Sequence, residues 1–240
     1  MNRVLIKSED RLISTDSVNN FRITLPDAIE GVYELSEVAI YNTIYTVISG
    51  RNNTVYTNAG NATLTSGYYT TTTLAAEIQS KLRTATGDAT VTCVFNSTTF
   101  KFDFTSTAAI IFQWSNGASD TASELLGFTN TNVLLNGSSS INPVNLTSTR
   151  GILIAIDKAT SASSIMTGSV SSSLSGSFYI PINASFGSMI NLTDHNNKQR
   201  VTIERATTLT IKLFDERGRT LQINDLNWSM LLEKVQIDYE

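Results

Sequence analysis

The sequence predicts a mainly β fold of the sandwich or barrel type, and three observations indicate it. Short stretches in which apolar and polar residues alternate, typical of half-buried strands, recur along the 240 residues. Clusters of Asn, Ser, Thr and Gly, which favour turns, separate these stretches. Only 16% of the residues are charged whereas 41% are hydrophobic, so neutral polar side chains must cover much of the surface.

Residues 1–19 are predicted to form a mostly polar arm that carries one apolar triplet. Val4, Leu5 and Ile6 lie among charged and polar residues, and such a triplet can add a strand to another element. We therefore expect the arm to reach a neighbouring subunit, with these three residues in the contact.

The first strands of the core are expected directly after the arm. Alternating apolar residues predict a strand over residues 21–25, which Pro26 is expected to end because it lacks an N–H donor. The pattern from residue 31 to residue 48 is long. It predicts either two strands or one strand that bends at Asn42 and Thr43.

Residues 53–135 differ in character and are predicted to form an inserted β–α–β–β–β subdomain. Thr71 or Thr72 is expected to be the N-cap of a helix that ends at Gly87. Its predicted buried face consists of Leu74, Ala75, Ile78 and Leu82. The strand candidates after it are residues 90–95, 100–104 and 110–114, and residues 122–128 are expected to form a helical turn that ends at Gly127.

The chain then returns to the β core, which consists of residues 20–52 and 136–240. Residues 152–156 are a continuous apolar run, which predicts a strand buried on both faces. Residues 157–176 are predicted to be a long functional or mobile loop. An edge strand around Pro181 and a short strand at residues 190–192 are expected next.

The last forty residues predict a hairpin followed by a closing strand. Residues 201–213 alternate, a turn is expected at residues 215–218, and Leu221 and Ile223 resume the alternation. The closing strand begins at Trp228, and we expect a bulge near residues 233–234. The predicted core anchors of this region are Trp228, Leu213 and Ile211.

No residue pattern indicates catalysis, a metal site or a cofactor, so we expect no enzyme. The single histidine, His195, lies among turn-forming residues, and the single cysteine, Cys93, alternates within an apolar run as a buried hydrophobe. The net charge is −4 and no basic stripe occurs, so nucleic acid is not expected as a primary partner. No apolar run reaches the roughly 18 residues that predict a membrane span.

Three aromatic residues are the candidates for a ligand platform. Tyr68 and Tyr69 follow Gly67, and Trp114 stands at the end of a predicted strand. An aromatic face of this kind can stack on a sugar. The alternative is structural, with the tyrosines in a turn that packs on the helix and Trp114 as a core or interface anchor.

Four groups of residues, in this order, carry a resemblance to a known family. They are SEDR (8–11) leading to NFRI (20–23); YNTIY (41–45) followed by NN (52–53); GYY (67–69) closed by ELLGF (124–128); and LFDERGR (213–219) running to LNWSM (226–230). Together they span most of the chain. The chain resembles the penton (vertex) capsid proteins of virophages, polinton-like viruses and related DNA viruses.

This resemblance implies a single jelly-roll sandwich of which five copies surround each icosahedral fivefold vertex of a virion. Its partners would then be other copies of itself and the major capsid protein, with a minor capsid protein as a further candidate. Some members carry an insertion on the outer side, which residues 53–135 would match.

Two rival functions belong to other classes. A minor capsid or spike module that binds a receptor or glycan would use the aromatic candidates named above. A β-sandwich hydrolase would need His195 or a pair of carboxylates.

Overall fold

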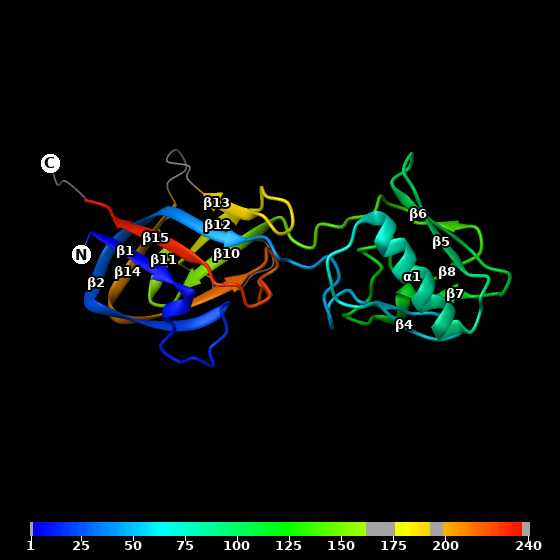
Figure 1. Cartoon of the computed structure of the whole chain (residues 1–240), viewed down its shortest axis with the longest axis horizontal. Helices are drawn as coiled ribbons and strands as arrows, with labels where there is room; N and C mark the ends of the chain where they lie inside the picture. The colour runs from blue at the N-terminus through cyan, green and yellow to red at the C-terminus, as the bar shows by residue number, and fades with distance from the viewer. Residues whose placement is uncertain (1, 162–175, 193–198, 237–240) are drawn as a thin grey trace. The chain divides into compact units, whose positions relative to one another are not determined.

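The computed structural model divides the chain into two compact units (Figure 1). Unit 1 comprises Met1–Ile44 and Thr149–Glu240, and unit 2 comprises Tyr45–Ser148. The mainly β class predicted from the sequence is confirmed. The residues that the structure describes are 2–161, 176–192 and 199–236.

Unit 1 is built on one curled sheet whose paired strands are all antiparallel. The sheet follows the order β1-β15-β2-β14-β10-β12, with β11 also paired to β14 and β13 to β2. Its strands are β1 (Arg3–Lys7), β2 (Asn20–Tyr41), β10 (Gly151–Ile156), β11 (Ala159–Ser161), β12 (Ser177–Pro181), β13 (Met189–Leu192), β14 (Arg200–Phe214) and β15 (Ser229–Lys234). A short 3-10 helix, η1 (Ser8–Asp10), follows β1.

The two long strands β2 and β14 bend together, and this bend turns one sheet into the two faces of a sandwich. Thr208 pairs with Thr24 and Ala206 with Ile29, so residues 25–28 of β2 bulge out of the ladder. Pro26 lies in this bulge, where its missing N–H removes no ladder bond. The expectation that Pro26 ends the strand is therefore wrong, because β2 continues to Tyr41.

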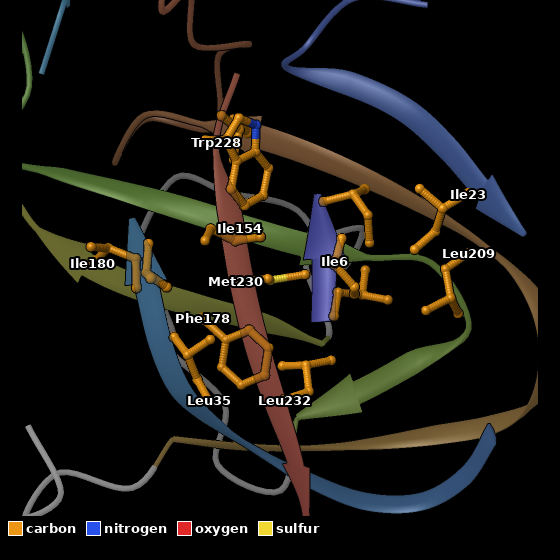
Figure 2. Close-up of a cluster of buried hydrophobic side chains, with 14 of the residues drawn as sticks. Ile6, Ile23, Leu35, Ile154, Phe178, Ile180, Leu209, Trp228, Met230 and Leu232 are labelled. Atoms are coloured by element: carbon orange, nitrogen blue, oxygen red, sulfur yellow. The ribbon is translucent and has the colours of Figure 1, made fainter. Parts of the chain in front are cut away.

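The bend separates two half-sheets. The β1 half-sheet, as we call it, consists of β1, β15, β13, the C-terminal half of β2 and the N-terminal part of β14 that pairs with it. The β10 half-sheet consists of the N-terminal half of β2, the C-terminal part of β14, β10 and β12. Figure 2 shows Ile6, Trp228 and Met230 of the β1 half-sheet pointing into the same interior as side chains of β10 and β12. The predicted anchors Trp228, Leu213 and Ile211 are all buried in this core.

A second bulge in β2, at Ser36, keeps the residues on both sides of it facing the core. Leu232 pairs with Leu35 and Leu231 with Glu37, so Ser36 is an extra residue opposite β15. The extra residue switches burial from odd positions to even ones, and Val38 is consequently buried. The bulge expected at residues 233–234 lies instead on the partner strand.

The N-terminal segment lies on its own unit. β1 pairs with β15 from Arg3 to Lys7, and Val4 and Ile6 are buried in the core of unit 1. Their assignment to an inter-subunit contact is corrected, because a strand that alternates about a covered sheet must turn every second side chain inward. Leu5, between them, points outward and stays 55% exposed.

Unit 2 packs one face of a single helix against short strands. Its elements are β3 (Thr54–Val55), β4 (Ala62–Thr63), α1 (Thr71–Thr86), β5 (Thr92–Asn96), β6 (Lys101–Thr105), β7 (Ile111–Phe112), the 3-10 helix η2 (Trp114–Asn116), β8 (Val133–Leu134) and β9 (Ser138–Ser139). The N-cap of α1 is Thr70, one residue before the predicted caps, because Thr73 completes a capping box with it. The buried face and the stop at Gly87, which has a φ of +72°, are as predicted.

The inserted unit is wider than the predicted range 53–135. Val47 lies in the hydrophobic core of unit 2, and Val144 and Leu146 pack against it. Polar residues separate these three from the alternating apolar stretches of unit 2. The sequence therefore does not show that the unit extends to Tyr45 and Ser148.

Two further expectations concern the return to unit 1. All six residues of β10 are buried, as predicted for a strand covered on both faces. The expected long loop at residues 157–176 is partly replaced by β11, and its residues 162–175 lie outside the described residues. His195 also lies outside them.

Candidate interaction surface

The free edge of β1 exposes unpaired backbone groups at the end of the sheet. Lys234 N donates to Asn2 O and Ser8 N to Trp228 O, so the even residues of β1 face β15. The N–H and C=O groups of Arg3, Leu5 and Lys7 therefore point away from the sheet. No described strand pairs with this side of β1. Such an edge is a template for an added strand.

The outer face of the β1 half-sheet has a charged end and an apolar centre. At the charged end Arg3 Nη2 lies 2.8 Å from Glu233 Oε1, and Arg200 Nε lies 3.5 Å from Glu34 Oε2. Arg3 is largely exposed, so its ion pair contributes little to stability, whereas the side chain of Glu34 is mostly covered. One row further along, Leu5 lies opposite Leu231 in the register of β1 and β15.

A shallow depression lined by both polar and apolar residues lies beside Leu5 and Leu231. It has a volume of about 110 Å³, and the residues that line it are Leu5, Glu37, Val38, Ala39, Asn191, Leu192, Ser229, Met230 and Leu231. Small-molecule sites typically span about 300–1,000 Å³. The depression is therefore too small for a drug-sized ligand, but it can accept one or two side chains of another protein.

The opposite end of the same half-sheet is also open. Asn42 N donates to Ser188 O. Because hydrogen-bonded residues alternate along an antiparallel ladder, the N–H and C=O groups of Ile190 and Leu192 also point toward β2. The N–H and C=O groups of Met189 and Asn191 point away from β2. No described strand pairs with them.

The edge of β12, by contrast, is blocked by a side chain. Tyr179 N donates to Gln199 Oε1 at 2.6 Å, and Gln199 Nε2 donates to Tyr179 O at 2.7 Å. The amide of Gln199 thus makes the two bonds that a neighbouring strand would make. Because Leu35 N also donates to Gln199 O, this residue links β12 to β2. β12 is consequently a poor template for an added strand.

The three aromatic platform candidates do not come together on the surface. Trp114 is 1% exposed and packs against Phe112 and Phe128 in the core of unit 2, with ring centroids 5.0 and 5.2 Å away. Its role as a ligand platform is corrected, because its faces are already covered. Tyr69 packs partly on the same core and donates its hydroxyl to Thr65 O. Tyr68 is 50% exposed.

The charged hairpin tip after β14 is held by a buried carboxylate. Asp215 is 1% exposed and accepts bonds from the backbone N–H groups of Arg217 and Arg219 at 2.9 Å. The guanidinium of Arg219 adds a third bond, with its Nε 2.7 Å from Asp215 Oδ2. Asp215 therefore shapes the turn.

Two aspartates of unit 2 are fixed by hydroxyl donors. Ser106 Oγ and Thr90 Oγ1 donate to the carboxylate of Asp88, and these bonds lower the pKa of Asp88 from 3.8 to about 2. Hydroxyl groups of Thr54 and Tyr56 likewise lower the pKa of Asp120. Both aspartates stabilise the local chain conformation through these hydrogen bonds.

The remaining groups supply no reactive constellation among the described residues. Burial raises the pKa of the Cys93 thiol, which disfavours the nucleophilic thiolate. No group of three or more His, Cys, Asp or Glu residues in the described ranges is placed to hold a metal ion. In the same ranges no helix is long and apolar enough to cross a membrane.

The two open edges, on β1 and β13, cannot be recognised from the sequence. The alternation of β1 and β13 shows which side chains are buried, but it carries no information about which strand lies alongside. Nothing in the sequence indicates that Gln199 binds the backbone of Tyr179, because a glutamine before a strand can make many kinds of contact. Leu5 is the one predicted contact residue that the structure leaves on a free surface.

Comparisons with known proteins give matches at the level of structure. No protein-family model and no curated protein matches the sequence. Among solved structures the chain is similar to the mavirus penton protein, with 10% sequence identity and a TM-score of 0.47 over 96% of this chain and 97% of that chain. It is also similar to a chain of the Sputnik virophage, with 10% identity and a TM-score of 0.45 over 97% of each chain.

Proposed function

We propose that this protein is a structural virion protein that forms homopentamers at the icosahedral fivefold vertices of a DNA-virus capsid. The observation that carries the proposal is the insertion of unit 2 into the sandwich of unit 1 between β2 and β10. Some members of the penton capsid family that the chain resembles carry such an insertion. The order of the resembling segments along the chain supports the same function.

The surface of unit 1 also supports a role in assembly. Among the described strands, the β1 half-sheet leaves two backbone edges unpaired, and Leu5 is exposed on the edge strand β1. Soluble sheets normally protect open edges with charge, proline or a covering element, and the edge of β13, with Met189 and Asn191 at its outward positions, carries no charge. Edges that a neighbouring subunit covers in the virion do not need this protection.

The chemistry of the described residues favours assembly over catalysis. The carboxylates with shifted pKa values, Asp88 and Asp120, are bound to neighbouring hydroxyl groups. The depression on the β1 half-sheet is smaller than a typical substrate pocket. We therefore propose the protein's own copies and the major capsid protein as its partners.

Coexpression with the major capsid protein of the same virus tests this function. We expect electron microscopy of the resulting capsids to show density of this protein at the fivefold vertices. Capsids made without it should have open vertices. Density at other positions, or closed vertices in its absence, would reject the vertex role. Binding of the isolated protein to glycans without ring formation would favour the receptor-binding alternative.

A further inference from the structure

We infer that, in the proposed ring, β1 of one copy pairs edge to edge with β13 of the next copy. This inference rests on the proposed function, because a closed ring of identical subunits needs a heterologous interface made by two different patches. The β1 half-sheet presents two such patches. They are its two open edges, formed by Arg3, Leu5 and Lys7 at one end and by Met189 and Asn191 at the other.

The strand directions permit this pairing. β1 is antiparallel to β15, β15 to β2, and β2 to β13, so β1 and β13 run in opposite directions. A neighbour placed beside β1 in the same orientation therefore adds an antiparallel strand, the commoner of the two pairings. The inner residues Val4 and Ile190 are buried on the same side of the sheet. In the joined sheet, the inward side chains of β1 and of the neighbouring β13 therefore lie on the same face.

Charge disfavours the pairing of β1 with another β1. An antiparallel pair centred on Leu5 would place Arg3 of each copy directly opposite Lys7 of the other, and like charges in this position destabilise a sheet. The edge of β13 is neutral, with Met189 and Asn191 at its outward positions. The edge of β12 is unavailable because Gln199 already binds Tyr179.

The exposed apolar residues select the register. Leu5 and Met189 are both outward-facing and exposed, and pairing them sets Arg3 beside Asn191. Within one copy, Leu5 pairs with Leu231, which in turn pairs with Glu37 of β2. Met189 pairs with Tyr41 of the same strand. Pairing Leu5 with Met189 therefore displaces the next copy along the strand direction by four residues, the separation of Glu37 and Tyr41 on β2.

A paired-cysteine variant tests the contact directly. Leu5→Cys together with Met189→Cys should give a ladder of disulfide-linked oligomers up to five chains under oxidising conditions. Cα atoms of directly paired residues lie about 5.5 Å apart, within disulfide reach. Cys93 is buried and stays out of the reaction. The Met189→Cys variant alone should give no ladder.

Each outcome of this experiment decides the inference. Dimers formed by Leu5→Cys alone would mean that β1 pairs with β1, and intact pentamers without cross-links in the double variant would mean that other surfaces meet. Either result overturns the inference but leaves the vertex function standing. Failure of the unmodified protein to form pentamers would instead reject the proposed function itself.

A proline variant supplies a second measurement. Leu5 N–H points away from β15, so Leu5→Pro removes an outward donor without breaking the ladder between β1 and β15. We expect an unchanged unfolding midpoint but no pentamers at about ten times the concentration at which the unmodified protein assembles. Leu134→Ala, at a comparably exposed leucine of unit 2, is the matched control and should assemble normally. Pentamers of the proline variant at the ordinary concentration would contradict the inference.

Discussion

At the scale of single residues, Trp228 holds the closing strand in the core of unit 1. Its ring meets Phe21 edge to face at 5.8 Å, and its indole Nε1 donates to Val18 O at 2.7 Å. The sequence indicates an anchor here, because a tryptophan opens an alternating apolar run. It does not indicate Val18 as the acceptor, which lies 210 positions away in the chain.

Replacement of Trp228 should therefore destabilise unit 1 strongly. We expect Trp228→Ala to lower the free energy of unfolding by about 3–5 kcal/mol, because it leaves a large cavity and an unpaired carbonyl. Urea unfolding followed by circular dichroism measures this loss. Leu226→Ala, at an exposed leucine nearby, is the control and should change stability by less than about 0.5 kcal/mol. Equal effects of the two substitutions would contradict the anchor role.

Asp88 should make unit 2 sensitive to acid. Its pKa is lowered from 3.8 to about 2 in the folded state, so the stabilisation it supplies is complete above pH 4 and is lost as the pH falls toward 2. We expect Asp88→Asn to flatten the decrease of the unfolding midpoint between pH 4 and pH 2. Asp27→Asn, at an exposed aspartate, should retain the slope of the unmodified protein. An unchanged slope in Asp88→Asn would exclude this role.

At the scale of elements, the side chain of Tyr179 on β12 lies across Gly151 on β10, where a larger residue would force the ring or the strand to shift. A Cβ atom built on Gly151 would lie 2.1 Å from Cε2 of Tyr179. The tyrosine ring therefore lies over the glycine and covers the backbone of β10. The apolar run in the sequence predicts a strand buried on both faces, but it does not indicate that a ring from β12 supplies one of the covers.

Gly151→Ala should thus destabilise unit 1 through Tyr179. We expect a loss of about 1–3 kcal/mol, because the ring or the strand must shift. The double variant with Tyr179→Ala should lose less than the sum of the two single variants, since the clash has been removed. Gly67→Ala is the control, because its Cβ would meet Tyr69 at an ordinary 3.5 Å. Strictly additive losses in unfolding experiments would show that the two positions do not interact.

Strand pairing explains which parts of the fold could be predicted at this scale. Most strands and the buried face of α1 follow from alternation and from helical periodicity. The bulge at Ser36 and the bend at residues 25–28 do not, because both arise from the register between distant strands. For the same reason the sequence identified Val4, Leu5 and Ile6 as an apolar group but could not place two of them in the core.

At the scale of the whole molecule, unit 2 has the parts that an independent domain needs. It has its own hydrophobic core, a helix capped at both ends, and a continuous chain from Tyr45 to Ser148. We propose that this unit folds by itself. The change of character near residue 53 revealed the insertion, whereas its limits depend on packing by Val47 and Leu146.

Expression of Tyr45–Ser148 alone tests this proposal. We expect a monomer that unfolds cooperatively, because its apolar residues are buried within the unit. Phe112→Ala in the same fragment should lower its stability by about 3–5 kcal/mol, since Phe112 packs on three aromatic rings of the core. A fragment without a cooperative transition would show that unit 2 depends on the rest of the chain.

The proposed assembly is the central claim at this scale, and native mass spectrometry of the purified full chain tests it most directly. The chain has a mass of 26.2 kDa. We predict a dominant species of five times that mass, which shifts to the single-chain mass in the Leu5→Pro variant. A stable monomer, dimer or trimer of the unmodified protein at the highest attainable concentration would contradict the pentameric vertex role.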